Sequence, residues 1–207
     1  MAAAFCLLAA SCSSEEDSYP SVITELVDVR TDPTGLVTDI TTDRGTRFNV
    51  SEQAIEAVQR DTLLRCRCTF LPTSTDTTSH KQTAKIYSIE RIPSALPISL
   101  SAVDTALLAP YQTMTHWGND RYYNLRVEYK TYGTARHSFV FIEDSISTAA
   151  DGAQTAFVSL RHIQEKNTSP AYTSTVFVSF PLFLYTKPQH LMLRFETKTG
   201  IESIQIR

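Results

Sequence analysis

The sequence predicts a mainly β protein built from two domains, and three observations support this prediction. Residues 123–130 alternate apolar and polar side chains with a period of two, as expected of a strand with one buried face. Residues 20–93 contain short β-type segments separated by turns, with one short helix among them. Between these regions, two prolines within 93–97 stiffen the chain and prevent a sheet ladder from continuing, so this segment is the linker.

The first domain covers residues 20–93 and has the element order of an OB-fold barrel. Its expected strands span residues 22–30, 35–42, 46–50, 63–71 and 83–92. Asp43-Arg44-Gly45 predicts the turn between the second and third strands. Ser51 caps an expected short helix over 52–59, and a helix between the third and fourth of five strands is the OB-fold order. The Thr- and Ser-rich residues 72–82 predict an exposed loop.

The second domain covers residues 98–207 and is expected to contain almost only strands. These span residues 123–130, 138–142, 156–162, 173–183, 191–196 and 201–206. No part of this region shows a helical period of apolar residues. Short strands at this density predict an antiparallel β-sandwich, so the fold class is mainly β, with an OB-fold barrel followed by a sandwich.

The N-terminus carries the pattern of a bacterial lipoprotein signal. An apolar run ends in Ala9-Ala10-Ser11-Cys12, and a polar, acidic stretch starts directly after the cysteine. Small residues before a cysteine suit cleavage by lipoprotein signal peptidase, although Leu8 lies four rather than three residues before it. The apolar run is far shorter than the ~20 residues of a spanning helix, so a lipid on Cys12 is the expected anchor. Residues 1–11 are then the signal peptide and 12–19 an acidic tether, the alternative being an ordinary secretory signal with a chance cysteine.

The residues after Cys12 also bear on localisation. Ser13-Ser14-Glu15-Glu16-Asp17 resembles the acidic export signal that Gram-negative gut anaerobes place after the lipidated cysteine of surface lipoproteins. We therefore expect a palmitate-bearing lipoprotein of the outer membrane that is displayed at the cell surface. A periplasm-facing anchor is the alternative.

Composition excludes some partners and most cysteine chemistry. The net charge of −3 offers no basic excess to attract nucleic acid, which we do not expect as a partner. Cys66 and Cys68 alternate with arginines in the fourth expected strand, so both thiols point to one face beside apolar residues. Neighbours this close on one strand rarely form a disulfide, and we expect two buried thiols that act as small hydrophobic residues.

No constellation of residues predicts catalysis, a cofactor or a metal. The five histidines are His80, His116, His137, His162 and His190, and no two of them have metal-ligand spacing. The sequence has no Gly-x-Ser-x-Gly elbow of a hydrolase, and its six glycines form no phosphate-binding loop. Glu143 and Asp144 are adjacent and would face opposite sides of a strand, which does not suit acid–base chemistry. We therefore expect a protein that is not an enzyme, with an envelope hydrolase built from distant residues as the alternative.

An OB-fold often binds ligands on its second and third strands, where this chain offers few suitable side chains. Arg44, Arg47 and Phe48 are the candidates there, and the remaining side chains are mostly threonines. Arg65 and Arg67, on the polar face of the fourth strand, either extend this basic strip or are solvated strand arginines. We expect the second of these two alternatives.

Aromatic residues concentrate near the start of the second domain. Trp117, Tyr123 and Tyr129 lie at or near inward positions, so we expect them in the core. Tyr122 and Tyr132 lie near a strand end and a turn. These two tyrosines are therefore candidates for an exposed surface that binds a ligand or a partner.

Several of these features together resemble the NigD-like family of bacterial lipoproteins. The resemblance rests on Cys12, on the OB stretch over 22–91 and on several short segments of the second domain. These segments are Trp117-Gly118, Tyr123-Asn124-Leu125, His137, Leu160-Arg161-His162 and Phe180-Pro181-Leu182. The resemblance covers essentially the whole mature chain and implies an exported lipoprotein with an N-terminal OB domain and a C-terminal β-sandwich. It implies no catalytic residues and no established activity.

The function that we expect is that of a non-enzymatic binding or accessory module of the cell envelope. The lipid on Cys12 holds such a module to the membrane, and its partner is an envelope protein or a glycan. Self-protection of a bacteriocin producer is the alternative that the resemblance implies, because the family is named after a gene beside a bacteriocin cluster.

Overall fold

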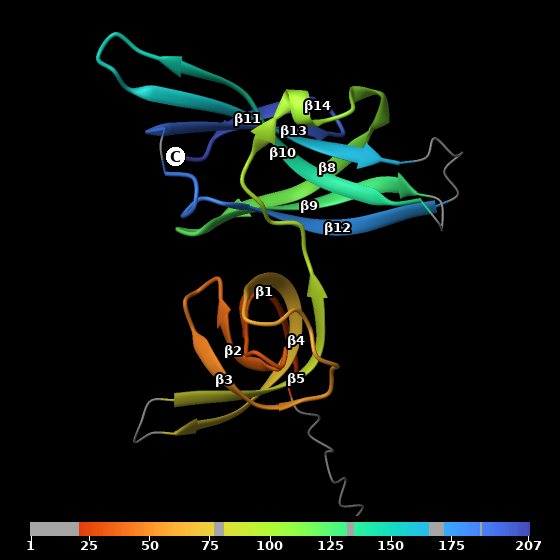
Figure 1. Ribbon diagram of the computed structural model, residues 1–207, viewed down its shortest axis with the longest axis vertical. Helices are drawn as coiled ribbons and strands as arrows, with labels where there is room; N and C mark the ends of the chain where they lie inside the picture. Colours follow the sequence, from red (N-terminus) through yellow and green to blue (C-terminus); the bar gives the residue numbers. More distant parts are fainter. Residues whose placement is uncertain (1–20, 77–80, 132–134, 166–171, 187) are drawn as a thin grey trace, which may run out of the picture.

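The protein folds into two stacked β domains, a barrel and a sandwich (Figure 1). The structure is a computed structural model that describes residues 21–76, 81–131, 135–165, 172–186 and 188–207. The predicted fold class, a mainly β chain with a barrel followed by a sandwich, is confirmed. Among the described residues, the helical elements are two 3₁₀ turns, η1 (Leu100–Ala102) and η2 (Thr105–Leu107). No helix in these parts of the chain is long and apolar enough to cross a bilayer.

Five strands close the barrel in the order β1-β2-β3-β5-β4. They are β1 (Ile23–Thr31), β2 (Val37–Thr42), β3 (Arg47–Gln53), β4 (Leu63–Asp76) and β5 (Lys81–Arg91). β1 pairs with both β2 and β4, and β3 runs parallel to β5. This is the strand order of an OB-fold. Alternate residues of each strand face inward and fill the barrel with apolar side chains.

The two cysteines of β4 lie inside this barrel. Both side chains are fully buried, and burial raises the pKa of each thiol to about 12. They belong to the same apolar cluster as Leu64 and Phe70. The expectation that Cys66 and Cys68 act as small hydrophobic residues is confirmed, because both are free and buried.

The helix expected over 52–59 is absent, and this prediction was wrong. β3 continues to Gln53, and the irregular connection to β4 packs Ile55 and Val58 on the barrel core. The Val58 amide donates to the Gly35 carbonyl at 3.0 Å, so it bonds the β1–β2 turn instead of a helical partner. Gly35 has a φ of +87°, and a side chain there would collide with the Val58 carbonyl oxygen.

The loop expected over 72–82 is shorter than predicted. β4 extends to Asp76 and β5 begins at Lys81, so these strands form a hairpin arm that projects beyond the barrel (Figure 1). The hydroxyl oxygens of Thr73 and Thr83 lie 3.0 Å apart across the arm. Threonine is polar but favours strands, which explains why the polarity of this stretch is misleading.

Two sheets form the sandwich, and its core lies between them. The larger sheet has the order β14-β13-β11-β10-β6, with β7 paired to β11. Its strands are β6 (Ile98–Ser99), β7 (Leu108–Ala109), β10 (His137–Thr148), β11 (Gln154–Gln164), β13 (His190–Thr197) and β14 (Gly200–Gln205). The predicted sandwich is thus confirmed, with the refinement that β6–β10 and β11–β13 are parallel pairs.

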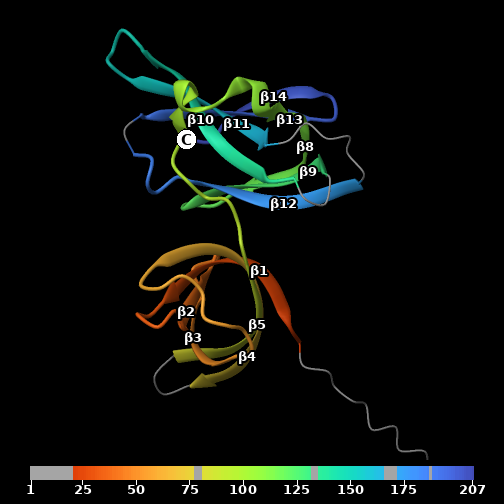
Figure 2. The ribbon, with the colours of Figure 1, turned by 45° about the vertical axis from the view of Figure 1, so that its right-hand side comes forward.

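The smaller sheet has the order β12-β9-β8 and is the layer nearest the barrel in both views (Figures 1 and 2). Its strands are β8 (Tyr111–Gly118), β9 (Tyr122–Thr131) and β12 (Tyr172–Pro181). The sequence does not predict β8, because only Tyr111 and Thr113 of this strand are buried. Because this sheet is nearest the barrel, its outer face carries the residues of the sandwich that contact the barrel.

Candidate functional site

The barrel and the sandwich meet through the outer faces of β1 and β4 on one side and of β8, β9 and β12 on the other. On the barrel side, β1 pairs with β4 so that Asp28 lies opposite Arg65. On the sandwich side, Trp117, Asn124 and Ser179 are Cα partners in one row across β8, β9 and β12. The two faces make a closed, polar end and an open, aromatic end of the interface.

Arg65 is the centre of the closed end, and its side chain is only 3% exposed. Its Nη2 lies 2.6 Å from Asp43 Oδ1, and its Nη1 lies 3.6 Å from Asp28 Oδ1. From the sandwich, Asn124 Oδ1 accepts a hydrogen bond from Nη2 at 3.1 Å, and Ser179 Oγ accepts one from Nε at 3.3 Å. We call these five residues the Arg65 hub. The hub compensates a buried cation with two carboxylates and two polar groups, as a buried charge requires.

Two neighbouring residues of the sandwich complete the bonding of Asp28. The Tyr122 hydroxyl donates to Asp28 Oδ1 at 2.7 Å, and Arg121 Nη2 donates to Asp28 Oδ2 at 2.8 Å. The Arg65 guanidinium also lies 3.9 Å from the centre of the Tyr122 ring. Burial and the nearby Asp28 carboxylate raise the pKa of Tyr122 above its ordinary value, so its hydroxyl remains a donor. These bonds fasten the barrel to the sandwich.

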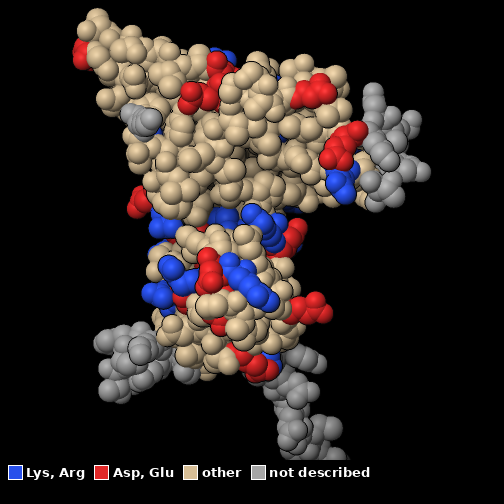
Figure 3. Space-filling view, viewed as in Figure 1, with Lys and Arg blue, Asp and Glu red and all other residues tan. Residues whose placement is uncertain are grey.

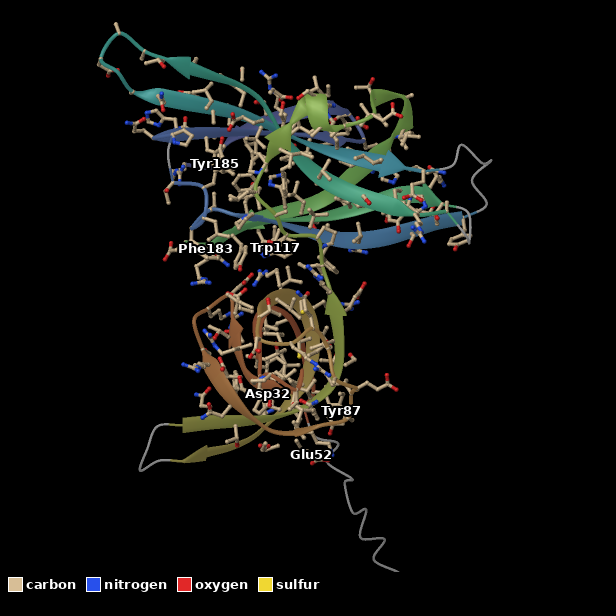
Figure 4. All side chains as sticks on the ribbon, in the orientation of Figure 1. Asp32, Glu52, Tyr87, Trp117, Phe183 and Tyr185 are labelled. Carbon is tan, nitrogen blue, oxygen red and sulfur yellow. The ribbon has the colours of Figure 1, made fainter. Side chains whose placement is uncertain are left out.

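The open end of the interface is a groove of about 290 Å³, which we call the interdomain groove. From the sandwich, Trp117 and Phe177 line it, and their rings meet edge to face with centroids 6.3 Å apart. Trp117 lies on the face of the sandwich that is turned toward the barrel (Figure 4). From the barrel, the lining residues are Thr24, Glu25, Leu26, Asp43, Arg44 and Arg67.

Two arginines supply hydrogen-bond donors to the groove. The Arg67 guanidinium lies 5.6 Å from the centre of the Phe177 ring and 3.6 Å from Glu90, with 48% of the side chain exposed. Arg44 is exposed in the β2–β3 turn and makes no ion pair with any described residue. Lys and Arg side chains gather along the waist between the domains (Figure 3). An aromatic corner beside guanidinium groups suits a ligand that has both an apolar face and acceptor atoms.

Trp117 faces this groove because of an irregularity in β8. The register with β9 shifts between Thr113 and Thr115, which marks a β-bulge. One extra residue reverses the alternation, so Thr113 faces the core while Trp117 faces the barrel. The expectation that Trp117 is a core residue is therefore wrong, and its side chain is 38% exposed. Tyr123 and Tyr129 do pack against the sandwich core, as expected.

The structure separates the residues that the sequence grouped into one candidate surface. Arg44 lines the groove, whereas Arg47 lies on the outer surface of β3 and pairs with Asp39 at 3.0 Å. The prediction that Phe48 belongs to a ligand surface is wrong. Its side chain is buried in the barrel and packs against Phe70, so it is not available to a ligand. The prediction that Tyr122 is exposed is also wrong, because this residue is buried beside the Arg65 hub.

Other expected residues have different outcomes. Tyr132 and Cys12 lie outside the described residues, so the predictions for both remain predictions. The expectation that Arg65 is a solvated strand arginine is wrong, since the second domain covers it. No sequence signal marks the hub, because Arg65 meets Asn124 and Ser179 only after the two domains pack together.

A pair of histidines forms a second polar cluster, inside the sandwich. His137 Nδ1 lies 2.8 Å from His162 Nε2, Thr131 Oγ1 lies 2.6 Å from His137 Nε2, and His162 Nδ1 lies 3.2 Å from the Pro110 carbonyl oxygen. Because that carbonyl can only accept, His162 Nδ1 carries a proton, and neutral His137 then donates from Nδ1 to His162 Nε2. Burial lowers the pKa of both imidazoles, and for His162 the neighbouring His137 lowers the pKa further.

The described residues contain no cluster of metal ligands, and the adjacent carboxylates Glu143 and Asp144 make hydrogen bonds within the fold. In these parts of the chain, no group of three or more His, Cys, Asp or Glu side chains is placed to hold a metal ion. β10 has a register shift between Glu143 and Ser145. Glu143 accepts a hydrogen bond from Tyr185, and Asp144 accepts one from Ser159 at 2.8 Å. Both carboxylates thus have a hydrogen-bond donor within the fold.

The fold and the site define a two-domain β protein in which a buried polar hub fixes an OB-fold barrel to a β-sandwich. The chain is similar to a NigD-like immunity protein from Bacteroides caccae at 24% identity, over 90% of this chain and 93% of that one, with a TM-score of 0.66. It is also similar to a putative toxin related protein from Parabacteroides distasonis at 15% identity, over 90% and 92% of the two chains, with a TM-score of 0.68.

A third similar structure is a putative lipoprotein from Bacteroides fragilis, at 12% identity over 89% of this chain and 96% of that one, with a TM-score of 0.61. No protein-family model and no curated protein matches the chain. The resemblance to NigD-like proteins is thus confirmed as a shared fold over nearly the whole chain. The proteins with this fold include one described as a lipoprotein.

Proposed function

We propose that the chain is a NigD-like lipoprotein that is anchored through Cys12 to the outer membrane and displayed at the cell surface. In this proposal it is a non-enzymatic binding module of the cell envelope, and the interdomain groove is its binding site. The lipoprotein signal in the sequence and the likeness to a putative lipoprotein support the anchor. The acidic residues that follow Cys12 support surface display.

The observation that carries the binding role is the outward orientation of Trp117. The bulge in β8 turns this side chain away from the core and places it beside Phe177 and two arginines. Bulges are over-represented next to functional sites, where they redirect side chains. Ligand sites also occur preferentially between domains, and they combine apolar walls with a few polar groups. The groove meets each of these criteria.

The pairing of the acidic residues that line the groove supports a role without catalysis. Asp43 is paired with the buried Arg65, which leaves Glu25 as the carboxylate of the lining that has no partner among the described residues. A general acid or base normally acts together with a second catalytic group. If the purified protein hydrolyses an ester, a peptide or a glycan, and Glu25→Gln abolishes that activity, the non-enzymatic part of the proposal is wrong.

The anchor is tested separately from the binding site. We expect the protein to incorporate labelled palmitate and to partition into the detergent phase, because a lipidated cysteine buries its acyl chains at ~0.8 kcal/mol per methylene. A Cys12→Ser variant should take up no label. Protease added to intact cells should degrade the anchored protein if it faces outward, and protection of the protein would favour the periplasm-facing alternative.

The binding role has a direct spectroscopic test, because Trp117 is the single tryptophan of the chain. We expect at least one compound in a panel of peptides, lipids, envelope glycans and small acids to shift its fluorescence. The response should be lost in Phe177→Ala. Arg47→Gln changes an exposed arginine of the same barrel outside the groove, so it should respond as the wild type does. If no compound of any class shifts the emission, the groove is not a binding site.

Self-protection against a bacteriocin is a second candidate function. The likeness in fold to a protein described as a NigD-like immunity protein favours it. Deletion of the gene should then make the producing strain sensitive to its own bacteriocin, and a variant altered in the groove should fail to restore protection. Unchanged sensitivity after deletion would remove this candidate.

A further inference from the structure

We propose that the interdomain groove binds a sugar ring that carries a carboxylate, as found in an acidic glycan. This inference rests on the proposed binding function and adds the chemical class of the ligand. Three properties of the groove support it: the angle between its aromatic rings, the two exposed guanidinium groups of Arg44 and Arg67, and the mixture of donors and acceptors in its lining.

The aromatic rings form a corner rather than a slot. The planes of Trp117 and Phe177 meet at 76°, with ring centroids 6.3 Å apart, so a flat aromatic ligand cannot stack between them. A saturated ring can pack the C–H groups of one face on one aromatic ring and its edge on the other. The groove volume of about 290 Å³ lies at the lower limit of typical ligand pockets, which suits a single ring unit of a longer chain.

The arginines at this corner offer hydrogen-bond donors to an anion. Arg44 has no ion pair among the described residues, and the pair of Arg67 with Glu90 is 3.6 Å long and solvent-exposed, so both guanidinium groups are available. Arg126 is a Cα partner of Phe177 on the outer face of the sheet and is also exposed. Guanidinium groups bind carboxylates through paired hydrogen bonds, which selects a carboxylate over an uncharged substituent.

The lining also needs a ligand that both accepts and donates hydrogen bonds. Arginine side chains only donate, so Arg44 and Arg67 require acceptor atoms on the ligand. Glu25 only accepts when it is ionised, so it requires a donor. Sugar hydroxyls do both, whereas a simple aromatic carboxylate offers no donor. A hexuronate unit satisfies the aromatic corner, the guanidinium groups and Glu25 together.

The test titrates the full chain carrying Cys12→Ser with trigalacturonate and follows the fluorescence of Trp117. We expect saturable binding, which Arg44→Gln and Arg67→Gln each weaken about tenfold, equivalent to about 1.4 kcal/mol. Arg47→Gln should bind within about twofold of the wild type, since its side chain lies outside the groove. Phe177→Ala should lose binding, and its circular dichroism spectrum shows whether it remains folded. Calorimetry on Trp117→Ala, which has no tryptophan signal, should also show no binding.

Two comparison ligands test which chemical groups of the ligand are recognised. The methyl ester of trigalacturonate keeps every ring but loses the charge, so equal affinity for the ester would overturn the role of the carboxylate. Benzoate has a carboxylate but no sugar ring, so equal affinity for benzoate would overturn the requirement for a sugar. If trigalacturonate has no effect while another compound of the panel shifts Trp117, this inference fails and the binding function stands. If nothing shifts Trp117, both fail.

Discussion

Arg65 and Arg67 lie two residues apart on the same outer face of β4, yet their environments differ sharply. Arg65 is 3% exposed and contacts two carboxylates and two polar side chains. Arg67 is 48% exposed, and its contacts are one exposed carboxylate and an aromatic ring. The second domain causes this difference, because it covers one arginine and leaves a groove beside the other.

The two arginines show that the interface is buried and fully paired at one end and open to solvent at the other. A buried ion pair gains little net stability over an apolar contact, but it strongly penalises any arrangement that leaves a charge unpaired. We therefore expect the Arg65 hub to determine how the two domains are oriented. An exposed arginine such as Arg67 is expected to have a small effect on folding, and in the proposed binding site its donors remain available to a ligand.

The largest expected effect comes from Arg65→Met. The substitution removes the buried cation and leaves Asp43 without its counter-charge, so we expect the free energy of unfolding to fall by about 3–5 kcal/mol. Denaturant unfolding at neutral pH measures it. Adding Asp43→Asn to the variant should recover part of the loss, because the unpaired carboxylate, which is only partly exposed, is then gone. A loss below about 1 kcal/mol would contradict the central role of the hub.

Tyr122→Phe is expected to have the next largest effect. It removes the hydroxyl that donates to Asp28 and keeps the ring beside Arg65. Hydrogen bonds to charged groups contribute about 1.5–3 kcal/mol, and Asp28 retains Arg121, so we expect a loss of about 1.5 kcal/mol in the free energy of unfolding. Tyr129→Phe is the matched control, since its hydroxyl has no hydrogen-bond partner among the described residues. Equal losses in both variants would contradict this prediction.

The histidine pair differs from the Arg65 hub, because its polar groups are buried in the neutral form. Burial lowers the pKa of His137 and His162, so near and below about pH 6.5 the unfolded chain binds more protons than the folded one. The stability from the neutral pair is complete above that pH and is lost as the pH falls through the folded pKa values. For each additional proton that the chain binds on unfolding, the free energy of unfolding falls by about 1.4 kcal/mol per pH unit as the pH is lowered.

This pH dependence is measured by denaturant unfolding between about pH 5 and about pH 7.5. Carboxylates elsewhere also contribute to the slope, so the comparison is with His137→Gln, which removes one titrating group and keeps a polar side chain. We expect a shallower slope for the variant than for the wild type. Identical slopes would contradict a pair that is held neutral by burial.

The sequence predicts those parts of the fold that depend on local patterns. Period-two alternation identifies most strands, and the five predicted strands of the first domain do close the expected OB-fold barrel. The position of Cys66 and Cys68 inside the barrel also follows from alternation along β4. The helix over 52–59 fails because the Val58 amide bonds Gly35, a contact between segments that local propensity does not include.

The site is less predictable because non-local contacts decide it. Of the residues predicted to form a ligand surface, Arg44 lines the groove, and its position in a turn makes it exposed. Trp117 is redirected by a bulge that becomes visible only in the register between β8 and β9. The antiparallel pairing of β10 and β11 brings His137 to His162, which sequence spacing does not indicate.

The smallest expected effect comes from Arg67→Met, and it completes the comparison with Arg65→Met. The pair of Arg67 with Glu90 is exposed, and methionine keeps a flexible apolar chain beside Phe177. We therefore expect the free energy of unfolding to change by less than about 1 kcal/mol in the same denaturant experiment. Binding of trigalacturonate should nevertheless weaken about tenfold, because the guanidinium is lost. If Arg67→Met destabilised the fold as much as Arg65→Met does, Arg67 would be a structural residue and its availability to a ligand would be disproved.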